Sequence, residues 1–316
     1  MKSHTNNKVV IIGAGYVGST TAYTLMQSGL VSEIALIDLD IKKAEGEVMD
    51  LNHCLSFTKP MTIKVGTYED CKDADLIIMT AGPSIQPGGT RLDLAKQNSQ
   101  IMTSIMKEIV KYTREAIILV ATNPVDILTQ VAVESVDYNP KKVLGSGTVL
   151  DSARFRYLLS QHCKVDARNV HGYILGEHGD SEVAAWSLTN IAGSPLESYC
   201  DNCNSNACHG LDKEGILNQV IHAGYHIIDR KVATYYGVST AIKRITEAIL
   251  RNEHSILTVS SLLNGEYGID KIAMSVPTIV SSEGIHKIVE LNLTDEESKL
   301  LKKSGDKLQE ILNYIK

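Results

Sequence analysis

The sequence lacks the features that mark several large protein classes. No run approaches the roughly 18 apolar residues that a membrane-spanning helix needs, so we expect no membrane partner. The N-terminal residues MKSHTNN are polar and lack the apolar core of a signal peptide, which predicts a cytoplasmic protein. Positive charge is not in excess. The net charge of -6 argues against a general nucleic-acid-binding protein, but it does not exclude a local basic pocket.

Cysteine is too scarce for a disulfide scaffold, because the chain has six cysteines in 316 residues. Three of them cluster at Cys200, Cys203 and Cys208, and His209 follows. Their spacing loosely resembles a zinc site but lacks the two well-separated ligand pairs of common zinc modules. We therefore expect a polar surface loop with reduced thiols and no metal. A metal-dependent regulatory module is the alternative.

A cofactor motif opens the chain. Lys8–Ile12 reads as a strand, a GxGxxG turn and a helical pattern follow, and a second strand, Glu33–Ile37, ends at Asp38. A lone GxGxxG is weak evidence, but this order, with an acid 20 residues after the last glycine, is typical of a dinucleotide-binding unit. The alternative is a glycine turn without a ligand.

Each motif residue has a physical role in such a unit. Gly13 makes the tight turn, Gly15 lets the backbone approach a pyrophosphate, and Gly18 allows close packing of helix and strand. The helix N-terminus favours the anionic phosphates. Asp38 can accept hydrogen bonds from both ribose hydroxyls and would repel a 2′-phosphate, which predicts NAD rather than NADP as the cofactor.

Strand and helix patterns then alternate through the first half. Further strands are expected at residues 62–65, 74–80, 116–121 and 142–144, with a long helix over 92–112. This alternation predicts an α/β fold with a Rossmann-type, doubly wound parallel sheet. Ligands on such sheets bind beyond the carboxyl ends of the strands. Four candidate cofactor residues follow strand ends: Gly13, Asp38, Gly82 and Asn123.

The pattern changes near residue 146, so we divide the chain into a cofactor-binding domain, residues 1–145, and a mixed α+β substrate domain, residues 146–316. The second half has strand patterns at 170–175 and 182–188, long helices at 211–235 and 238–251, and a β-rich stretch at 255–291. A final helix opens with a capping-box pattern, Thr294 to Glu297. Early in this half, Asp151 and Arg154 are three positions apart on a predicted helix, so both can face one cleft.

His178 is the residue around which the second half is organised. It follows a predicted strand and lies in the sequence GEHGD, between two glycines that tolerate unusual backbone angles. Histidine can hold or release a proton near neutral pH, which suits a catalytic acid or base. A histidine that merely happens to lie in a turn is the alternative. Arg91 ends a loop rich in glycine and proline, residues 81–91, which suggests a mobile lid.

Taken together, these segments resemble the L-lactate/L-malate dehydrogenase family, its lactate branch most closely. The resemblance spans nearly the whole chain and is most specific in LDSARFR and GEHGDSE; it includes IGAGYVGS, PGGTRLDL, ATNPVD and ATYYGV. It implies an NAD-dependent oxidoreductase of glycolysis that interconverts pyruvate and L-lactate by hydride transfer.

The resemblance also implies residue roles. His178 would be the proton donor and acceptor, and Asp151 would hydrogen-bond its other ring nitrogen. Arg154 would bind the substrate carboxylate, and Arg91 would polarise the substrate carbonyl. Two residues would complete the site: Asn123, which orients substrate and nicotinamide, and Thr234, which lines the substrate pocket.

The lid departs from the lactate branch, which usually carries glutamine where this chain has Ile85. An apolar residue there disfavours malate and could favour longer or branched 2-oxo acids, although such discrimination is worth only about 1–3 kcal/mol. Alternatively, a shifted loop places Gln86 in the usual position. Gly89 is a second departure, because larger residues are common there, and it could loosen the lid.

The resemblance suggests a homotetramer and an allosteric site. Bacterial members are often activated by fructose 1,6-bisphosphate at a subunit interface, and the resemblance places Arg156 and His171 at the phosphate-binding positions. Both are basic, as an anion site requires. A non-catalytic NAD-binding relative is the alternative from another class. That interpretation predicts loss of the catalytic groups, all of which are present.

Overall fold

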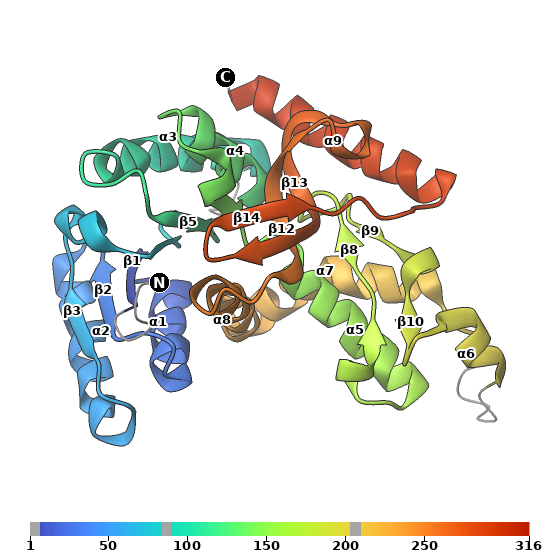
Figure 1. Ribbon diagram of the computed structural model, residues 1–316, viewed down its shortest axis with the longest axis horizontal. Coiled ribbons are helices and arrows are strands. Elements are labelled where there is room, and N and C mark those ends of the chain that lie inside the picture. Colours follow the sequence, from blue (N-terminus) through green and yellow to red (C-terminus); the bar gives the residue numbers. More distant parts are fainter. Residues whose placement is uncertain (1–6, 84–89, 203–209, 316) are drawn as a thin grey trace.

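One continuous sheet runs through the molecule. The structure, a computed structural model, describes residues 7–83, 90–202 and 210–315. Its main sheet has nine strands in the order β14-β13-β12-β6-β5-β4-β1-β2-β3 (Figure 1). The six strands from the first half are β1 (Lys8–Ile12), β2 (Glu33–Ile37), β3 (Thr62–Val65), β4 (Leu76–Met79), β5 (Ile117–Val120) and β6 (Val143–Gly145).

These six strands form the predicted parallel sheet. All their pairings are parallel, and the order of the six is that of a doubly wound Rossmann-type sheet. The central strands β1, β4 and β5 are buried on both faces, because helices cover both. In β1, for example, Val9 and Ile11 pack into one core, while Val10 and Ile12 pack into the other.

Helices cover the two faces of the parallel strands (Figure 1). Buried residues of α1 (Tyr16–Ser28), α2 (Ile41–His53) and α8 (Tyr236–Leu250) share one core. The opposite core takes buried residues of α3 (Arg91–Ile109) and α4 (Val125–Glu134). A helix from the second half therefore completes the packing against the first.

The second half also extends the sheet itself, which the sequence did not predict. Its strands β12 (Ser255–Asn264), β13 (Asp270–Ser281) and β14 (Gly284–Ile288) are antiparallel. Ser260 of β12 pairs with Gly145 of β6, so the junction near residue 146 lies inside one sheet. The remaining helices are α5 (Val149–Cys163), α6 (Leu196–Asn202), α7 (Lys213–Lys231) and α9 (Asp295–Ile315).

Two strands expected in the second half are shorter than predicted. Residues 170–175 form β7 (Val170–His171) and β8 (Ile174–Leu175), which belong to different small sheets. The break falls at Gly172, where an added Cβ would lie 2.7 Å from Phe155. Residues 182–188 form only β9 (Val183–Ala184) and then a 3-10 turn. Two further short strands are β10 (Asn190–Ile191) and β11 (Ser194–Pro195).

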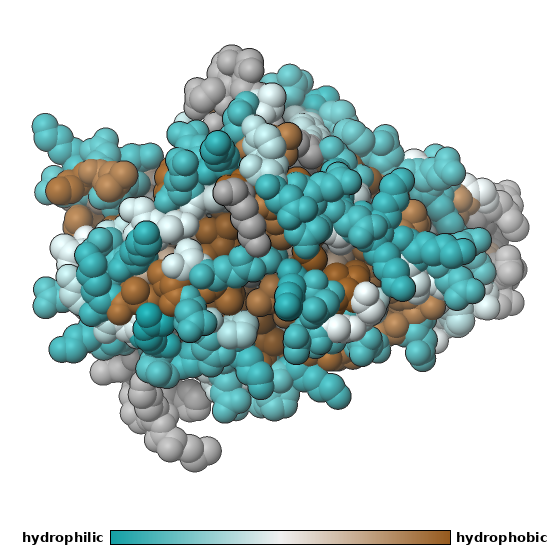
Figure 2. All heavy atoms as spheres, turned by 90° about the horizontal axis from the view of Figure 1, so that it is seen from above, coloured by the Kyte–Doolittle hydropathy of each residue, from teal (hydrophilic) through white to brown (hydrophobic). Residues whose placement is uncertain are grey.

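Among the described residues, no helix is long and apolar enough to cross a membrane. Figure 2 shows hydrophilic side chains over much of one face, with hydrophobic ones in its middle and at the end where Figure 1 places α2 and β3. Of the large apolar side chains that the structure describes, the most exposed are Leu39, just before α2, and Phe57, after it, at 98% and 88% exposure. Of the predicted cysteine loop, only Cys200 lies among the described residues, where it is a free thiol; Cys203, Cys208 and His209 lie outside them.

Candidate active site

His178 lies in the loop that joins β8 to β9. The loop leaves β8 at Gly176, whose φ of 92° favours glycine and whose backbone bridges to Ser275 of β13. Two buried side chains then hold the loop from other elements. Asp126 of α4 accepts a hydrogen bond from the His178 amide at 2.8 Å, and Ser304 of α9 accepts one from the Glu177 amide at 2.8 Å. The backbone of His178 is therefore fixed from three sides.

The start of α5 brings an acid to the histidine ring. Ser152 of α5 accepts a hydrogen bond from the Ile174 amide of β8 at 3.0 Å, which ties the helix to the strand that leads to His178. In this position, Asp151 Oδ2 lies 2.7 Å from His178 Nδ1, and Arg154 Nη1 donates to Asp151 Oδ1 at 2.7 Å. Asp151 is completely buried, whereas the side chain of His178 is 25% exposed. The histidine can thus present its other nitrogen, Nε2, to a ligand.

The charges in this cluster favour an ionised Asp151 and a protonated His178. Burial raises the pKa of Asp151, but the charges and hydrogen bonds of His178 and Arg154 outweigh it and hold that pKa below its usual value. Burial lowers the pKa of His178, but Asp151 and Glu182 outweigh it, so the pKa lies well above the ordinary value. With Asp151 ionised, Nδ1 carries a hydrogen and donates it, which leaves Nε2 as the nitrogen that gains or loses a proton.

Sequence reasoning missed two buried acids around His178. Asp126 accepts hydrogen bonds from the His178 amide and from Ser275, and burial raises its pKa to about 6. Glu182 Oε1 lies 3.4 Å from His178 Nδ1. Glu182 stands in the GEHGDSE motif and Asp126 in ATNPVD, so both were within segments already singled out. The partners of Asp126 lie on elements distant in the sequence, which left no local signal for its contacts, whereas Glu182 lies only four residues after His178.

The glycine turn at the end of β1 has no room for a side chain at Gly13 or Gly18. Gly13 has a φ of 111°, and an added Cβ there would lie 2.6 Å from the Ala81 amide nitrogen. A Cβ on Gly18 would lie 1.8 Å from the Gly13 carbonyl oxygen. Gly15 differs, because an added Cβ would meet nothing within 4 Å, so its backbone borders open space.

The same turn presents hydrogen-bond donors to that space. Gly15 caps α1 without a side-chain hydrogen bond, so the first amides of the helix have no side-chain acceptor at the cap. Such amides suit the oxygens of a pyrophosphate. Asp38, at the end of β2, accepts hydrogen bonds from the Ala14 amide at 2.6 Å and the Asp40 amide at 2.9 Å, which places its carboxylate beside the turn. The residues present therefore fit a dinucleotide.

The other predicted site residues lie at strand and helix ends around this edge. Gly82, with a φ of 151°, follows β4, and Asn123 follows β5, where its carbonyl accepts a hydrogen bond from Asn98 at 2.7 Å. Thr234 is half-buried, and its neighbour Tyr235 stacks on Tyr16 of the glycine turn at 5.5 Å between ring centroids. Arg91 begins α3. Ile85, Gln86 and Gly89 lie outside the described residues.

Arg156 and His171 lie away from the histidine cluster. Arg156 Nε donates to the Gly172 carbonyl at 2.9 Å, and its guanidinium lies over the Tyr173 ring at 5.5 Å. Burial lowers the pKa of Arg156 from its ordinary value. His171 is the residue before Gly172 and is exposed. The two basic residues therefore belong to one region, where α5 meets β7.

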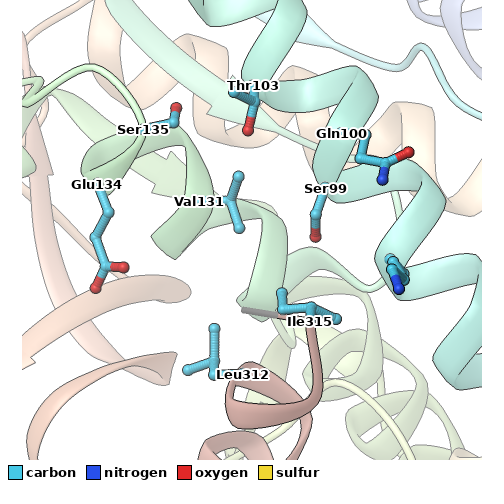
Figure 3. A pocket seen from close by; sticks show the side chains of 9 residues that line it. Ser99, Gln100, Thr103, Val131, Glu134, Ser135, Leu312 and Ile315 are labelled. Carbon is cyan, nitrogen blue, oxygen red and sulfur yellow. The ribbon is translucent and has the colours of Figure 1, made fainter.

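A separate hollow of about 400 Å³ lies between α3, α4 and α9 (Figure 3). Ser99, Gln100 and Thr103 of α3 face Val131 and Glu134 of α4 across it, and Leu312 and Ile315 of α9 close one side. None of the predicted site residues is among those that line it.

Comparison with known protein families matches both halves of the chain. Residues 7–145 match the model of the lactate/malate dehydrogenase NAD binding domain. Residues 148–316 match the model of the lactate/malate dehydrogenase alpha/beta C-terminal domain.

Individual relatives agree with the family models over nearly the full length. An L-lactate dehydrogenase of Acetivibrio thermocellus is 57% identical, covering 98% of this chain and 99% of its own. L-lactate dehydrogenase 1 of Clostridium acetobutylicum is 51% identical over the same shares. Among solved structures, the minor L-lactate dehydrogenase of Enterococcus mundtii in its ligands-bound form superimposes with a TM-score of 0.94 at 43% identity, covering 98% of this chain and 99% of that one.

Proposed function

Because the chain belongs to the lactate/malate dehydrogenase family, we propose that it is an NAD-dependent enzyme that interconverts pyruvate and L-lactate. The observation that carries the proposal is the 2.7 Å contact between His178 Nδ1 and the buried Asp151. Because Asp151 occupies Nδ1, the other ring nitrogen of His178, Nε2, can exchange a proton with a 2-oxo or 2-hydroxy acid. The similar enzymes are named L-lactate dehydrogenases, which favours pyruvate over longer or branched acids.

The first half holds the cofactor in this proposal. Bound NAD supplies or accepts the hydride. Gly13, Gly15 and Gly18 let the backbone and the uncapped α1 terminus meet its pyrophosphate, and Asp38 receives its ribose hydroxyls. Gly82 and Asn123 border the same edge of the sheet from β4 and β5. We keep the division into a cofactor domain, residues 1–145, and a substrate domain, residues 146–316.

The histidine and its acid move the proton. His178 donates from Nε2 to the carbonyl oxygen of pyruvate during reduction and accepts the hydroxyl proton of lactate during oxidation. Asp151 keeps the hydrogen on Nδ1 and stabilises the imidazolium. Since burial removes water from Asp151, its charge acts on the ring with little screening.

Two arginines and two polar residues position the substrate. The guanidinium of Arg154 matches the substrate carboxylate as a two-point donor, and its bond to Asp151 keeps it beside His178. Arg91, at the start of α3, polarises the substrate carbonyl. Asn123 and Thr234 line the pocket. The resemblance to the family assigns the choice between pyruvate and branched acids to Ile85 or Gln86, which lie outside the described residues.

The assembly and its regulation belong to the same proposal. We propose a cytoplasmic homotetramer that acts in glycolysis. The exposed apolar side chains of Leu39, Met49 and Phe57, which lie on and beside α2, support contact of this helix with a second subunit. Fructose 1,6-bisphosphate would bind at Arg156 and His171, and the support is the nearness of two basic residues at α5 and β7.

The test is steady-state reduction of pyruvate and of 4-methyl-2-oxopentanoate with NADH, with and without fructose 1,6-bisphosphate. We expect a higher kcat/KM for pyruvate and little activity with NADPH, since Asp38 would face the 2′-phosphate. A preference for the branched acid would mean that Ile85 sets the substrate specificity. The substrate assignment would then change to branched 2-oxo acids, and the mechanism would stay the same. Failure to reduce either acid would overturn the proposal. Unchanged saturation curves and sedimentation with the bisphosphate would remove the allosteric site.

A further inference from the structure

A second carboxyl group faces the same nitrogen of His178 as Asp151. Glu182 lies four residues after His178 in the loop between β8 and β9, and its Oε1 is 3.4 Å from His178 Nδ1. One polar side-chain atom from each of Asp151, His178 and Glu182 forms a group in which all three atoms lie within 4.8 Å of one another. The histidine ring therefore has two acids at its Nδ1 edge, one from α5 and one from its own loop.

Glu182 is buried without full compensation. Its side chain is 2% exposed, and its second oxygen, Oε2, has no hydrogen-bond partner within the described part of the chain. A buried polar atom without a partner lowers the stability of the folded state. Serine or alanine would avoid that cost in this loop. The arrangement is therefore explained better by a role for the carboxyl group than by stability.

The charges around Glu182 come from several elements. Asp151 and Arg154 face it from α5, and His178 faces it from the loop. Burial and the charge of Asp151 raise its pKa to about 7, against the opposite effects of His178 and Arg154. Asp126 of α4 bonds the His178 amide. Glu177 points the other way, toward Lys307 of α9 at 3.2 Å.

We propose that Glu182 is a positioning residue: its buried carboxyl group acts with Asp151 on the Nδ1 edge of His178 and strengthens the hold of that ring on its proton. The ionised carboxylate adds a second negative charge beside the imidazolium, while Arg154 offsets part of the first. The role in catalysis rests on the proposed function. The effect on the proton affinity of His178 does not, and it can be measured without substrate.

The test measures the protonation of His178 directly. Diethyl pyrocarbonate reacts with neutral imidazole, so the rate at which His178 is modified, followed by peptide mass spectrometry across pH, gives its titration midpoint. We expect Glu182→Gln, which removes the charge and keeps the size, to lower the midpoint by about 1 pH unit. Glu177→Gln is the matched control. It removes a charge one residue from His178 that faces Lys307, and we expect the midpoint to stay within about 0.2 units. EDTA is present throughout, so that no bound cation contributes.

Kinetics provide the second readout. In Glu182→Gln, the alkaline limb of the kcat/KM profile for pyruvate should shift to lower pH by the same amount as the modification midpoint. The value of kcat/KM at low pH should stay close to that of the wild type. A uniform loss at all pH values, with an unchanged midpoint, would identify a merely structural role and overturn the proposal. Glu182→Asp, which keeps the charge but shortens the side chain, gives a smaller shift and serves if Glu182→Gln does not fold. If the wild type fails to reduce pyruvate, only the proposed function falls, because the modification midpoint stands apart from turnover.

Discussion

Asp151 shows how a completely buried carboxylate can remain charged. An isolated buried charge is costly, so such groups are paired. Here one oxygen receives Arg154 and the other faces His178, both at 2.7 Å. The acid therefore joins two groups that the proposed reaction needs in different roles, one for the substrate carboxylate and one for the proton.

Replacement of Asp151 tests this joint role. We expect Asp151→Asn to lower kcat for pyruvate reduction by at least about 100-fold, because the ring loses the anion that stabilises its imidazolium and fixes its tautomer. Asp166→Asn is the control, since Asp166 pairs with Arg168 on the surface, and its kcat should change less than about twofold. NADH absorbance at saturating pyruvate measures both. Equal effects of the two substitutions would contradict the role of Asp151.

The pKa of His178 predicts opposite pH profiles for the two directions. Reduction needs the protonated ring, so its kcat/KM should be flat through neutral pH and fall as pH rises through the raised pKa. Lactate oxidation needs the neutral ring and should rise over the same range. The stability that protonated His178 contributes is present below its ordinary pKa, near 6.5, and is lost as pH rises through the raised value. If kcat/KM for pyruvate reduction began to decline with rising pH before pH 6 was reached, the result would be inconsistent with this arrangement.

At this scale, sequence reasoning reached the residues that local spacing or a motif could reveal. The three-residue spacing of Asp151 and Arg154 predicted a shared helix face, and the structure joins them by an ion pair. Asp126 could not be placed in the same way, because its partners are the His178 amide and Ser275 of β13. Such contacts depend on how distant elements pack, which no periodicity records.

At the scale of elements, the glycine turn shows where a single methyl group decides the structure. We expect Gly18→Ala to reduce the free energy of unfolding by about 1–3 kcal/mol or more, because its Cβ would lie 1.8 Å from the Gly13 carbonyl oxygen. NADH binding should weaken at least about 10-fold, since the turn that meets the pyrophosphate must shift.

A matched glycine lies in the next helix. Gly46 of α2 has nothing within 4 Å of an added Cβ, so Gly46→Ala should raise the free energy of unfolding by up to about 1 kcal/mol and leave NADH affinity unchanged. Urea unfolding and fluorescence titration with NADH measure both variants. If Gly18→Ala kept its stability and NADH affinity as Gly46→Ala does, the close approach at Gly18 would have no consequence and the prediction would be wrong.

Element prediction succeeded where hydrophobic periodicity was strong. The strands of the first half, from β1 to β6, lie within a few residues of the predicted ranges, and the capping box predicted for α9 is present: Thr294 and Glu297 exchange hydrogen bonds of 3.0 and 3.2 Å. The pattern at 170–175 was misread as one strand. Its two parts belong to different sheets, because Gly172 packs against Phe155.

At the scale of the whole molecule, the two predicted halves share a core as well as a sheet. Ile242, Ile245 and Val259 from the second half pack with Val9 and Ile11 of β1. The change of pattern near residue 146 marked a difference in topology, but it did not reveal this shared packing, which depends on long-range antiparallel pairing. The two halves therefore differ in their strand and helix patterns, but the stability of each depends on the core that they share.

We expect the whole chain to unfold in one calorimetric transition at fixed protein concentration. Saturating NADH should raise the Tm of that single transition, because a ligand bound to the first half also stabilises what is packed against it. NADPH at the same concentration is the control and should raise it much less, given Asp38. Two separated transitions, with only one moved by NADH, would contradict the shared core.

The hydrogen-bonded seam between Gly145 and Ser260 also limits how this chain can be recombined. A chimaera that joins residues 1–145 to the second half of a relative must preserve the register of β12 on β6, and it must preserve the fit of α8 against α1 and β1. Exchange at the predicted boundary near residue 146 alone would cut through a sheet and a core. The natural unit of exchange is therefore the first half together with α8 and β12, although these elements begin only at Tyr236 and Ser255.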